Sequence, residues 1–496
     1  MKPYKVFLFL LALFGGLALL SSVYPAEGLK INEDLTLDFP SVKELFAVDT
    51  TEKKDFSFVL ETTFDIDSIS EEEQRKMDSL RTRMEQDSIR QWQLKLHYPN
   101  GDKTILYSLF QLLDEAEKNP VRIMHYGDSQ IEGDRITGFL RHKLQNKFGG
   151  NGPGLLAAAP LVRSAGIDHS NSDNWGRFTL YGKKDSLVKH SNFGILATYG
   201  RYAPIYQDSI PNDSIIYSGW ISLKRSTITF PKTKYFQRFR MFYGNNQKSF
   251  LLNLYAKDSL IVSDSIAPGK KVRYFEHTFN FSPKEVRIEF SGKDSPDIYA
   301  FSLEGTNGVI VDNIAMRGSS GTIFRKLDRS NLQFSYAKLP IKLLVLQFGG
   351  NVMPYIEDEK EAEQYGKWFE SQIHLLKTLI PDVSIIVIGP SDMGILENDE
   401  FTTYPLLTKV RDELKKATFK QNGVYWDLFE AMGGEKSMQA WVDSKPPLAG
   451  KDYVHFNHNG ATKVAQMFYN ALIHDYNEYK SLQSPTAKIN EKDTIR

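Results

Sequence analysis

The residues best suited to chemistry lie in four short segments, far apart in the chain: Gly127-Asp128-Ser129, Gly318, Gly349-Gly350-Asn351 and Asp452-Tyr453-Val454-His455. Together they offer a serine hydroxyl, an imidazole, a carboxylate that can orient the imidazole, and amide groups that can hold an oxyanion. Acyl transfer through a serine nucleophile requires each of these parts. The sequence therefore predicts a site that hydrolyses or transfers an ester group.

The context of Ser129 separates it from the many other serines that follow an aspartate, such as Ser68 and Ser265. Only Ser129 lies between a predicted strand at residues 121–126 and a predicted helix at 131–148. A sharp turn there exposes the hydroxyl, and the start of the helix leaves N–H groups free to donate. We predict that Ser129 is the nucleophile.

The spacing of Asp452 and His455 suits a base and the carboxylate that orients it. A loop of this length can fold the carboxylate back onto Nδ1, which leaves Nε2 as the base. His458 raises the alternative of a metal site, but no third ligand of suitable spacing accompanies the two histidines. We therefore expect neither a metal nor a cofactor.

The oxyanion donors are expected on the loops that follow two further predicted strands. Asn351 follows the strand at 343–348 after two glycines, which allow its amide to approach closely. The N–H groups of Gly318 and Ser129 are the other candidates, and Gly321 competes with Gly318. Ser319 is disfavoured as a nucleophile, because its flanking residues do not form a G-x-S-x-G elbow.

Hydrophobic patterning predicts two kinds of structure around these segments. Apolar residues recur at helical spacing in 103–120, 131–148, 361–379 and 460–479, and buried parallel strands are expected at 121–126, 309–311, 343–348 and 384–388. Between residues 168 and 308 the pattern changes to short alternating runs, which is typical of an antiparallel sandwich. We thus predict an α/β domain interrupted by a β-sandwich. The glycine run at 149–154 is interpreted as a turn and not as a phosphate loop.

The predicted organisation has six parts. They are an N-terminal signal or anchor (1–26), a spacer with a charged helix (27–100), the first part of the α/β domain (101–167), the sandwich insertion (168–308), the second part of the α/β domain (309–480) and a loose polar tail (481–496).

The first residues predict export. Lys2 and Lys5 precede an apolar run at 6–20, as in an export signal. Ala26 has Tyr24 two places before it, which is a poor context for cleavage. We therefore favour an uncleaved anchor in the inner membrane with the body of the protein in the periplasm; the alternative is a cleaved signal and a secreted protein.

Composition excludes several classes of function. The 61 basic and 61 acidic residues balance, so there is no basic excess to bind a nucleic acid. The chain has no cysteine, which excludes disulfides, thiolate catalysis and zinc–thiolate sites.

The four segments, in this order, resemble those of the GDSL or SGNH hydrolase superfamily. The resemblance implies a flavodoxin-like, three-layer fold with a parallel sheet of about five strands. It also implies that Ser129 is the nucleophile, that Asp452 and His455 complete the triad, and that Gly318 and Asn351 join Ser129 in the oxyanion hole. Gln130 replaces the Leu of the eponymous motif, which argues against the lipase-like branch, and Val352 replaces an Asp that often follows the Asn of this block.

A narrower resemblance covers about residues 121–479. Five segments are similar to those of bacterial esterases that remove O-acetyl groups from peptidoglycan, namely residues 125–130, 148–154, 311–313, 389–393 and 452–456. Those proteins also carry a carbohydrate-module-like sandwich between the first two catalytic blocks. The resemblance implies a serine carbohydrate esterase that acts on an acetylated envelope or extracellular polysaccharide.

Two alternatives stay open at this point. A polysaccharide O-acetyltransferase would use the same triad with a sugar hydroxyl in place of water. An anchored carbohydrate-binding protein without catalysis would instead use exposed aromatic side chains, for which the candidates are Trp175, Tyr199, Tyr202, Trp220 and Tyr235. The sequence predicts no particular oligomeric state.

Overall fold

A computed structural model describes residues 3–23, 29–30, 36–37, 56, 59–60, 65, 67, 93, 95–183, 185–205, 214–397 and 400–483. The chain divides into two compact units, Met1–Asp55 and Phe56–Arg496, and each is described by itself. Most of the predicted spacer with its charged helix, and the predicted tail beyond residue 483, lie outside the described residues.

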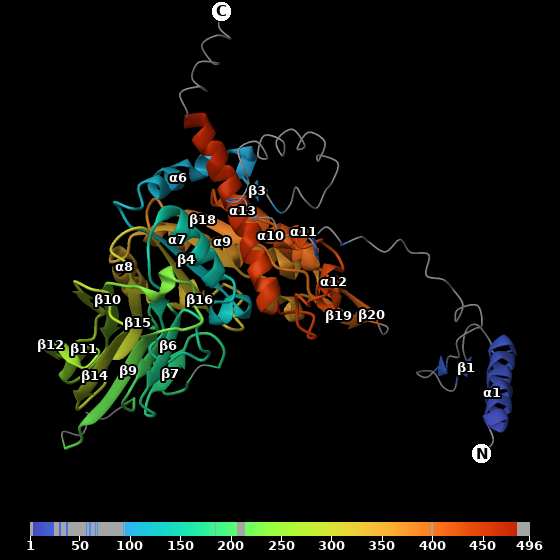
Figure 1. Cartoon of the computed structure of the whole chain (residues 1–496), viewed down its shortest axis with the longest axis horizontal. Helices are drawn as coiled ribbons and strands as arrows, with labels where there is room; N and C mark the ends of the chain where they lie inside the picture. The colour runs from blue at the N-terminus through green and yellow to red at the C-terminus, as the bar shows by residue number, and fades with distance from the viewer. Residues whose placement is uncertain are drawn as a thin grey trace, which may run out of the picture. The chain divides into compact units, whose positions relative to one another are not determined.

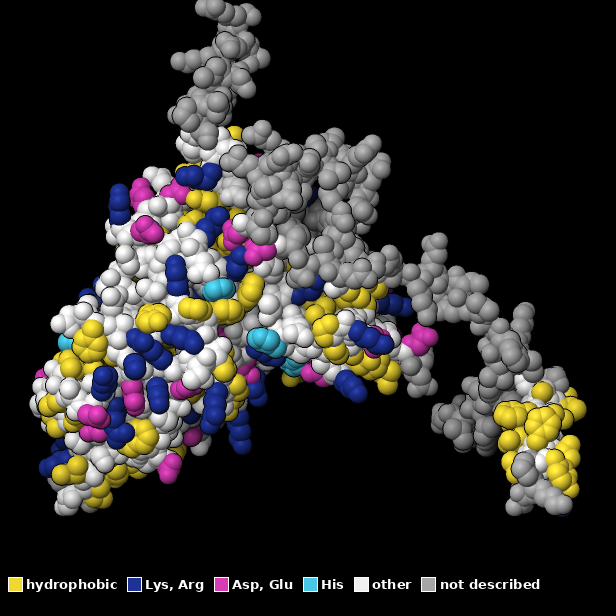
Figure 2. Space-filling view, viewed as in Figure 1, with side chains coloured by type: hydrophobic (Ala, Val, Ile, Leu, Met, Phe, Trp, Pro, Cys, Tyr) yellow, Lys and Arg dark blue, Asp and Glu magenta, His cyan; other side chains and the backbone are white. Residues whose placement is uncertain are grey.

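The first unit contains one long apolar helix, α1 (Pro3–Val23). Its segment Tyr4–Ser21 is long and apolar enough to cross a membrane, and its side chains are almost all exposed, as the yellow surface in Figure 2 shows. An export signal and a membrane anchor both have this character. Two short antiparallel strands follow, β1 (Leu29–Lys30) and β2 (Thr36–Leu37).

The second unit is built around a six-stranded sheet in the order β16-β4-β17-β18-β21-β3. The first five strands are parallel, and β3 pairs antiparallel with β21 at the edge. The strands are β16 (Val309–Ala315), β4 (Val121–Gly127), β17 (Ile341–Gln347), β18 (Ser384–Ile388), β21 (Val424–Trp426) and β3 (Leu96–His97). Every residue of β4 and β18 is buried, because helices cover both faces of the sheet.

Successive strand residues supply two separate apolar cores. Ile123 and Val345 belong to the core shared with α6 (Tyr107–Asp114), α7 (Thr137–Phe148) and α13 (His458–Gln483). Met124 and Leu344 belong to the core shared with α8 (Arg329–Ala337), α9 (Glu359–Leu379) and α10 (Leu407–Lys420). Since side chains alternate across a strand, the sheet is the middle of three layers (Figure 1).

Two antiparallel sheets occupy the chain between α7 and β16 (Figure 1). One has the order β13-β10-β15-β8-β7, with β5 also paired to β15, and the other has the order β12-β11-β14-β9-β6. Their apolar side chains form a third core, to which Ile221 and Leu252 contribute from one sheet and Phe239 and Met241 from the other. The strands are β5 (Gly154–Leu156), β6 (Ile167–Asn171), β7 (Gly176–Thr179), β8 (Thr198–Arg201), β9 (Tyr217–Arg225), β10 (Arg238–Gly244), β11 (Phe250–Ala256), β12 (Ser259–Ile266), β13 (Arg273–Thr278), β14 (Glu285–Gly292) and β15 (Asp297–Glu304).

The remaining elements are short. They are the helices α11 (Leu428–Ala431) and α12 (Ser437–Asp443), the hairpin β19 (Gly394–Glu397) and β20 (Glu400–Thr403), and the 3₁₀ segments η2 (Pro99–Gly101), η3 (Lys103–Leu106), η4 (Ser129–Asp134), η5 (Lys232–Lys234), η6 (Phe324–Lys326) and η7 (Gly350–Tyr355).

A buried ion cluster connects the central sheet to the antiparallel sheets. Arg122 on β4 is fully buried and donates from Nη1 to both carboxylate oxygens of Asp312 on β16, at 2.9 and 3.0 Å. The same guanidinium contacts Glu304 on β15. Both carboxylates are fully buried as well, so their charges depend on Arg122 and its neighbours.

The predicted strands at 121–126, 343–348 and 384–388 are confirmed to within two residues, and the predicted helix at 361–379 lies within α9. The predicted start of the helix at 131 is wrong. Glu132 is extended, and both Gly133 (φ 71°) and Asp134 (φ 70°) have positive φ, so α7 begins only at Thr137. The helix predicted at 103–120 is also shorter, because η3 replaces its first turn and α6 ends at Asp114.

Candidate active site

The turn that presents Ser129 begins where β4 ends. A Cβ atom on Gly127 would lie 2.9 Å from the Ile131 side chain and 3.2 Å from the Gln347 carbonyl oxygen, so a larger residue there would have to displace its neighbours. The Asp128 side chain accepts a hydrogen bond from the Gln130 N–H at 2.9 Å. This bond caps η4, whose first residue is Ser129.

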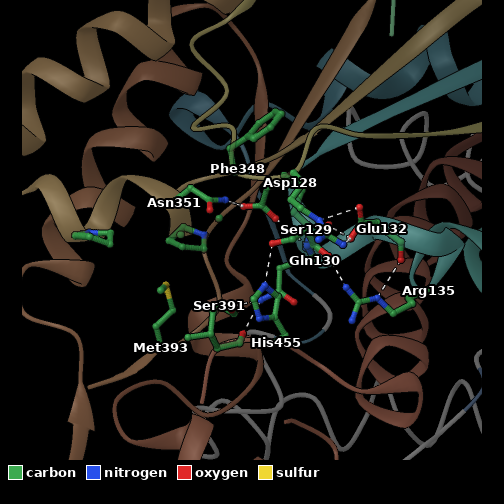
Figure 3. A pocket seen from close by; sticks show the side chains of 18 of the residues that line it. Asp128, Ser129, Gln130, Glu132, Arg135, Phe348, Asn351, Ser391, Met393 and His455 are labelled. Carbon is green, nitrogen blue, oxygen red and sulfur yellow. Dashed lines mark hydrogen bonds and ion pairs between the residues drawn. The ribbon is translucent and has the colours of Figure 1, made fainter. Parts of the chain in front are cut away.

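Ser129, His455 and Asp452 are joined by two short hydrogen bonds. Ser129 Oγ lies 2.8 Å from His455 Nε2 (Figure 3), and His455 Nδ1 lies 2.8 Å from Asp452 Oδ2. Because an ionised carboxylate only accepts, Nδ1 carries the proton and Nε2 is left to accept the proton of Ser129. The three side chains that the sequence predicted as a triad therefore lie in the order that the chemistry requires.

The loop before His455 is folded around Asp452. Asp452 Oδ1 accepts from the backbone N–H groups of Val454 at 3.1 Å and His455 at 3.0 Å. Partial burial raises the pKa of Asp452, but these hydrogen bonds and the one from the His455 ring outweigh it and lower the pKa below its ordinary value. Asp452 is thus a carboxylate at neutral pH.

Asn351 lies beside Asp128, in η7 beyond the end of β17 (Figure 3). Its Nδ2 donates to Asp128 Oδ2 at 2.8 Å and makes a long contact of 3.4 Å with the Ser319 carbonyl oxygen. Burial raises the pKa of Asp128 to about 6, so this carboxyl is mostly ionised at neutral pH and orients the amide. The second Nδ2 proton is held only weakly.

The structure distinguishes Gly318 from Gly321. Gly318 (φ 77°) lines the cavity beside Ser129, and a Cβ atom on it would meet nothing within 4 Å. Gly321 instead packs against the interior, where a Cβ atom would lie 2.7 Å from the Phe348 ring, and its N–H donates to Ser319 Oγ. Of the two glycines, only Gly318 lines this cavity.

Ser129, His455, Asn351 and Gly318 line a cavity of about 650 Å³. Its walls come from the loop before α13 and from the loops after β4, β16, β17 and β18, at the carboxyl ends of four parallel strands, where open α/β sheets bind ligands. None of the described lining residues comes from 168–308. The lining is Asp128, Ser129, Gln130, Glu132, Arg135, Arg317, Gly318, Gln347, Phe348, Gly350, Asn351, Pro354, Tyr355, Gly389, Pro390, Ser391, Met393, Val454 and His455.

The cavity is lined by further residues that the sequence did not reveal. Arg317 pairs with Glu132 there. Tyr355, which is 75% exposed, and Met393 add apolar surface to the lining. Tyr355 lies only four residues beyond Asn351, and this proximity is the signal by which it could have been found.

The cluster of possible metal ligands that the described residues contain lies on α13. His474, Asp475 and Glu478 have ligand atoms within 4.8 Å of one another. The Lys103 ammonium already contacts Asp475 at 3.0 Å and Glu478 at 2.6 Å, so a cationic side chain takes the place that an ion would need.

The fold of this chain is similar to that of a solved protein structure. No family model and no curated protein matches the chain. A solved structure of a peptidoglycan O-acetylesterase superposes with a TM-score of 0.60 at 19% identity, over 77% of this chain and 99% of that one. At this identity the likeness shows a shared fold.

Other solved structures are similar over smaller shares of this chain. A family two carbohydrate esterase from Clostridium thermocellum gives a TM-score of 0.23 at 9% identity, over 53% of this chain and 93% of that one. A carbohydrate acetylesterase from Sinorhizobium meliloti gives 0.25 at 10% identity, over 33% and 78%. These two TM-scores are too low to show a shared fold.

Proposed function

We propose that the chain is a serine carbohydrate esterase that removes O-acetyl groups from an envelope polysaccharide. The observation that supports this best is the hydrogen-bonded series Ser129–His455–Asp452 at the wall of a cavity far larger than an acetyl group. The amide of Asn351 and the N–H of Gly318 lie on the same cavity and supply candidate oxyanion donors.

In the proposed reaction, Ser129 Oγ attacks the acetyl carbonyl carbon while His455 Nε2 takes the hydroxyl proton. Asp452 stabilises the imidazolium through Nδ1. The N–H groups of Ser129 and Gly318 and the amide of Asn351 hold the negative oxygen of the tetrahedral intermediate. Collapse of this intermediate breaks the bond to the sugar oxygen, which leaves with the proton of His455, and Ser129 is acetylated.

Water then completes the cycle. His455 Nε2 removes a proton from water as its oxygen attacks the acetyl group, and Ser129 leaves with that proton to release acetate. The His455 side chain is 39% exposed and that of Asp452 is 54% exposed, so bulk water reaches the base directly. This exposure favours hydrolysis over transfer to a second sugar, because transfer requires that water be excluded.

The proposed domain structure rests on the order of the strands in the central sheet. In chain order the five parallel strands are arranged 2-1-3-4-5, which is the flavodoxin-like order. We assign residues 101–167 and 309–480 to one SGNH hydrolase domain and 168–308 to a β-sandwich inserted in it, with the correction that β5 and β6, which pair with β15 and β9, extend the sandwich back to residue 154. The insertion enters before β16, at the end of the sheet opposite the loops that surround Ser129.

The proposed substrate is O-acetylated peptidoglycan or a similar acetylated glycan. The fold is shared with an esterase of that substrate, and α1 suits an anchor that holds the protein in the periplasm at the inner membrane. The cavity presents both an exposed ring, Tyr355, and a charged pair, Arg317 and Glu132. Sugars bind well to such surfaces, which offer stacking and hydrogen bonds together.

Acetate release from a panel of acetylated glycans tests the proposal directly. The full chain, purified in detergent because of α1, should release acetate from at least one glycan and hydrolyse p-nitrophenyl acetate. Ser129→Ala and His455→Ala should each lose more than about 1000-fold in kcat. Ser481→Ala, at an exposed position on α13, is the matched control. Full activity in either site variant would end this mechanism.

The same assay separates the two alternatives. An acetyltransferase would form an acetylated oligosaccharide when an acceptor is added, at the expense of free acetate. A carbohydrate-binding protein without catalysis would bind the glycan and release no acetate, whichever residue stands at position 129.

A further inference from the structure

Gln130, the residue after the nucleophile, makes two side-chain hydrogen bonds to the loop that carries His455. Its Nε2 donates to the Val454 carbonyl oxygen at 2.6 Å, and its Oε1 accepts from the Phe456 N–H at 3.3 Å. Val454 and Phe456 are the immediate neighbours of His455. The two ends of one amide therefore hold the backbone on both sides of His455.

Arg135 supplies a second connection between the same two loops. Its Nη1 donates to the Phe456 carbonyl oxygen at 2.9 Å, and its Nη2 contacts the Ser129 carbonyl oxygen. The turn that presents Ser129 is thus linked to the loop of His455 by side chains that lie outside the triad. The distance between the nucleophile and the base is set by these links as well as by the hydrogen bond that joins them.

This matters most after Ser129 has been acetylated. Its Oγ then has no proton to donate, so the 2.8 Å hydrogen bond to His455 Nε2 is lost. The His455 side chain is 39% exposed and its partner Asp452 is 54% exposed, so packing alone holds neither in place. The hydrogen bonds of Gln130 do not involve the reacting atoms and persist through this stage.

We propose that Gln130 is a positioning residue that keeps His455 aligned for the attack of water on the acetyl-enzyme. The inference rests on the proposed function, because it assigns Gln130 to the second half of that reaction. It predicts that the rate of deacylation depends on Gln130 more strongly than the rate of acylation does. A displacement of about 1 Å in a catalytic group costs on the order of 100-fold in rate.

The test is Gln130→Met, which keeps the length of the side chain and removes both hydrogen bonds. Gln333→Met, at an exposed position on α8, is the matched control. With p-nitrophenyl acetate, kcat should fall about 10-fold to 100-fold while kcat/KM falls less than about threefold. A burst of p-nitrophenol should appear as deacylation becomes limiting. A purely structural role would instead lower the burst amplitude and leave the rate constants unchanged, and that result would overturn the inference.

A second measurement does not depend on turnover. Hydrogen exchange, followed by mass spectrometry on the peptide that covers residues 452–457, should be at least about tenfold faster in Gln130→Met than in the wild type and in Gln333→Met. Unchanged exchange in this peptide overturns the inference, even in an active enzyme. If exchange is faster in Gln130→Met but the wild type releases no acetate, Gln130 does hold the His455 loop and the proposed function is refuted. If Gln130→Met does not fold, Gln130→Glu, which loses only the bond to Val454, is measured in the same way.

Discussion

Asp452→Asn is the substitution whose effect the structure predicts most closely. Asp452 Oδ1 accepts from two backbone N–H groups, those of Val454 and His455, and an asparagine can satisfy them only with its single oxygen. Its NH₂ group must then face His455 Nδ1, where Oδ2 now lies at 2.8 Å. Nδ1 becomes the acceptor, the proton moves to Nε2, and Nε2 donates to Ser129 instead of accepting from it.

The expected loss in kcat is about 1000-fold, or about 4 kcal/mol in the free energy of activation. A fully buried aspartate in such a triad is worth about 10,000-fold. Asp452 is 54% exposed, so water competes for the ring and reduces the cost. Asp452→Ala should lose less, about 100-fold, because it removes the carboxylate without imposing the wrong tautomer.

The assay is kcat for p-nitrophenyl acetate at neutral pH, with Asp443→Asn at the exposed end of α12 as the control. The reasoning is refuted if Asp452→Asn keeps more than a tenth of the wild-type kcat, or if it is faster than Asp452→Ala. Either result would mean that the tautomer of His455 is not set by Asp452.

Three further predictions follow from the surroundings of the site. Asn351→Ala should lower kcat about 100-fold to 1000-fold with little change in KM for p-nitrophenyl acetate, because one oxyanion donor is lost; an equal effect of Asn307→Ala, at an exposed position, would contradict this. Burial raises the pKa of Asp128 from 3.8 to about 6, so the folded chain binds the carboxyl proton more tightly than the unfolded chain does. The free energy of unfolding should therefore fall by about 3 kcal/mol as the pH rises from about 4 to about 6. Thermal unfolding should therefore show Asp128→Asn gaining stability relative to the wild type over that pH range, and a constant difference would disprove the assignment. Tyr355→Ala should raise KM for a glycan substrate about twofold to tenfold and leave kcat for p-nitrophenyl acetate unchanged, as expected of a ring that stacks on a sugar.

The central sheet could be predicted from the sequence because its strands are buried on both faces. Residues 384–388 form one continuous apolar run after Ser384, which leaves no competing helical or alternating interpretation, and the strand has these bounds in the structure. The edge strand β3 was missed, since Leu96–His97 is too short to show any period. The break in the helix after Ser129 was also missed, because it depends on the positive φ of Asp134, a residue that pattern alone leaves helical.

In the candidate site, too, some residues could be predicted from the sequence and others could not. Ser129, His455 and Asp452 could be predicted because their residue types and spacing are constrained by chemistry, and the structure brings them together. Gln130 could not be predicted as a contact of the His455 loop. Its partners are backbone groups 324 and 326 residues away, and any residue type presents the same carbonyl and N–H groups.

The fully buried Arg122 couples the stability of the central sheet to that of the β-sandwich. Of the two carboxylates that neutralise it, Glu304 belongs to the antiparallel sheet and Asp312 to the central one. Deleting residues 168–308 would leave Arg122 paired with Asp312, but its Nη2 group would lose both Glu304 and Ser302, and a buried polar group left without its partners costs about 1–3 kcal/mol. A shortened version of the protein should therefore be less stable than the full chain, so grafting experiments must treat the two sheets as one unit.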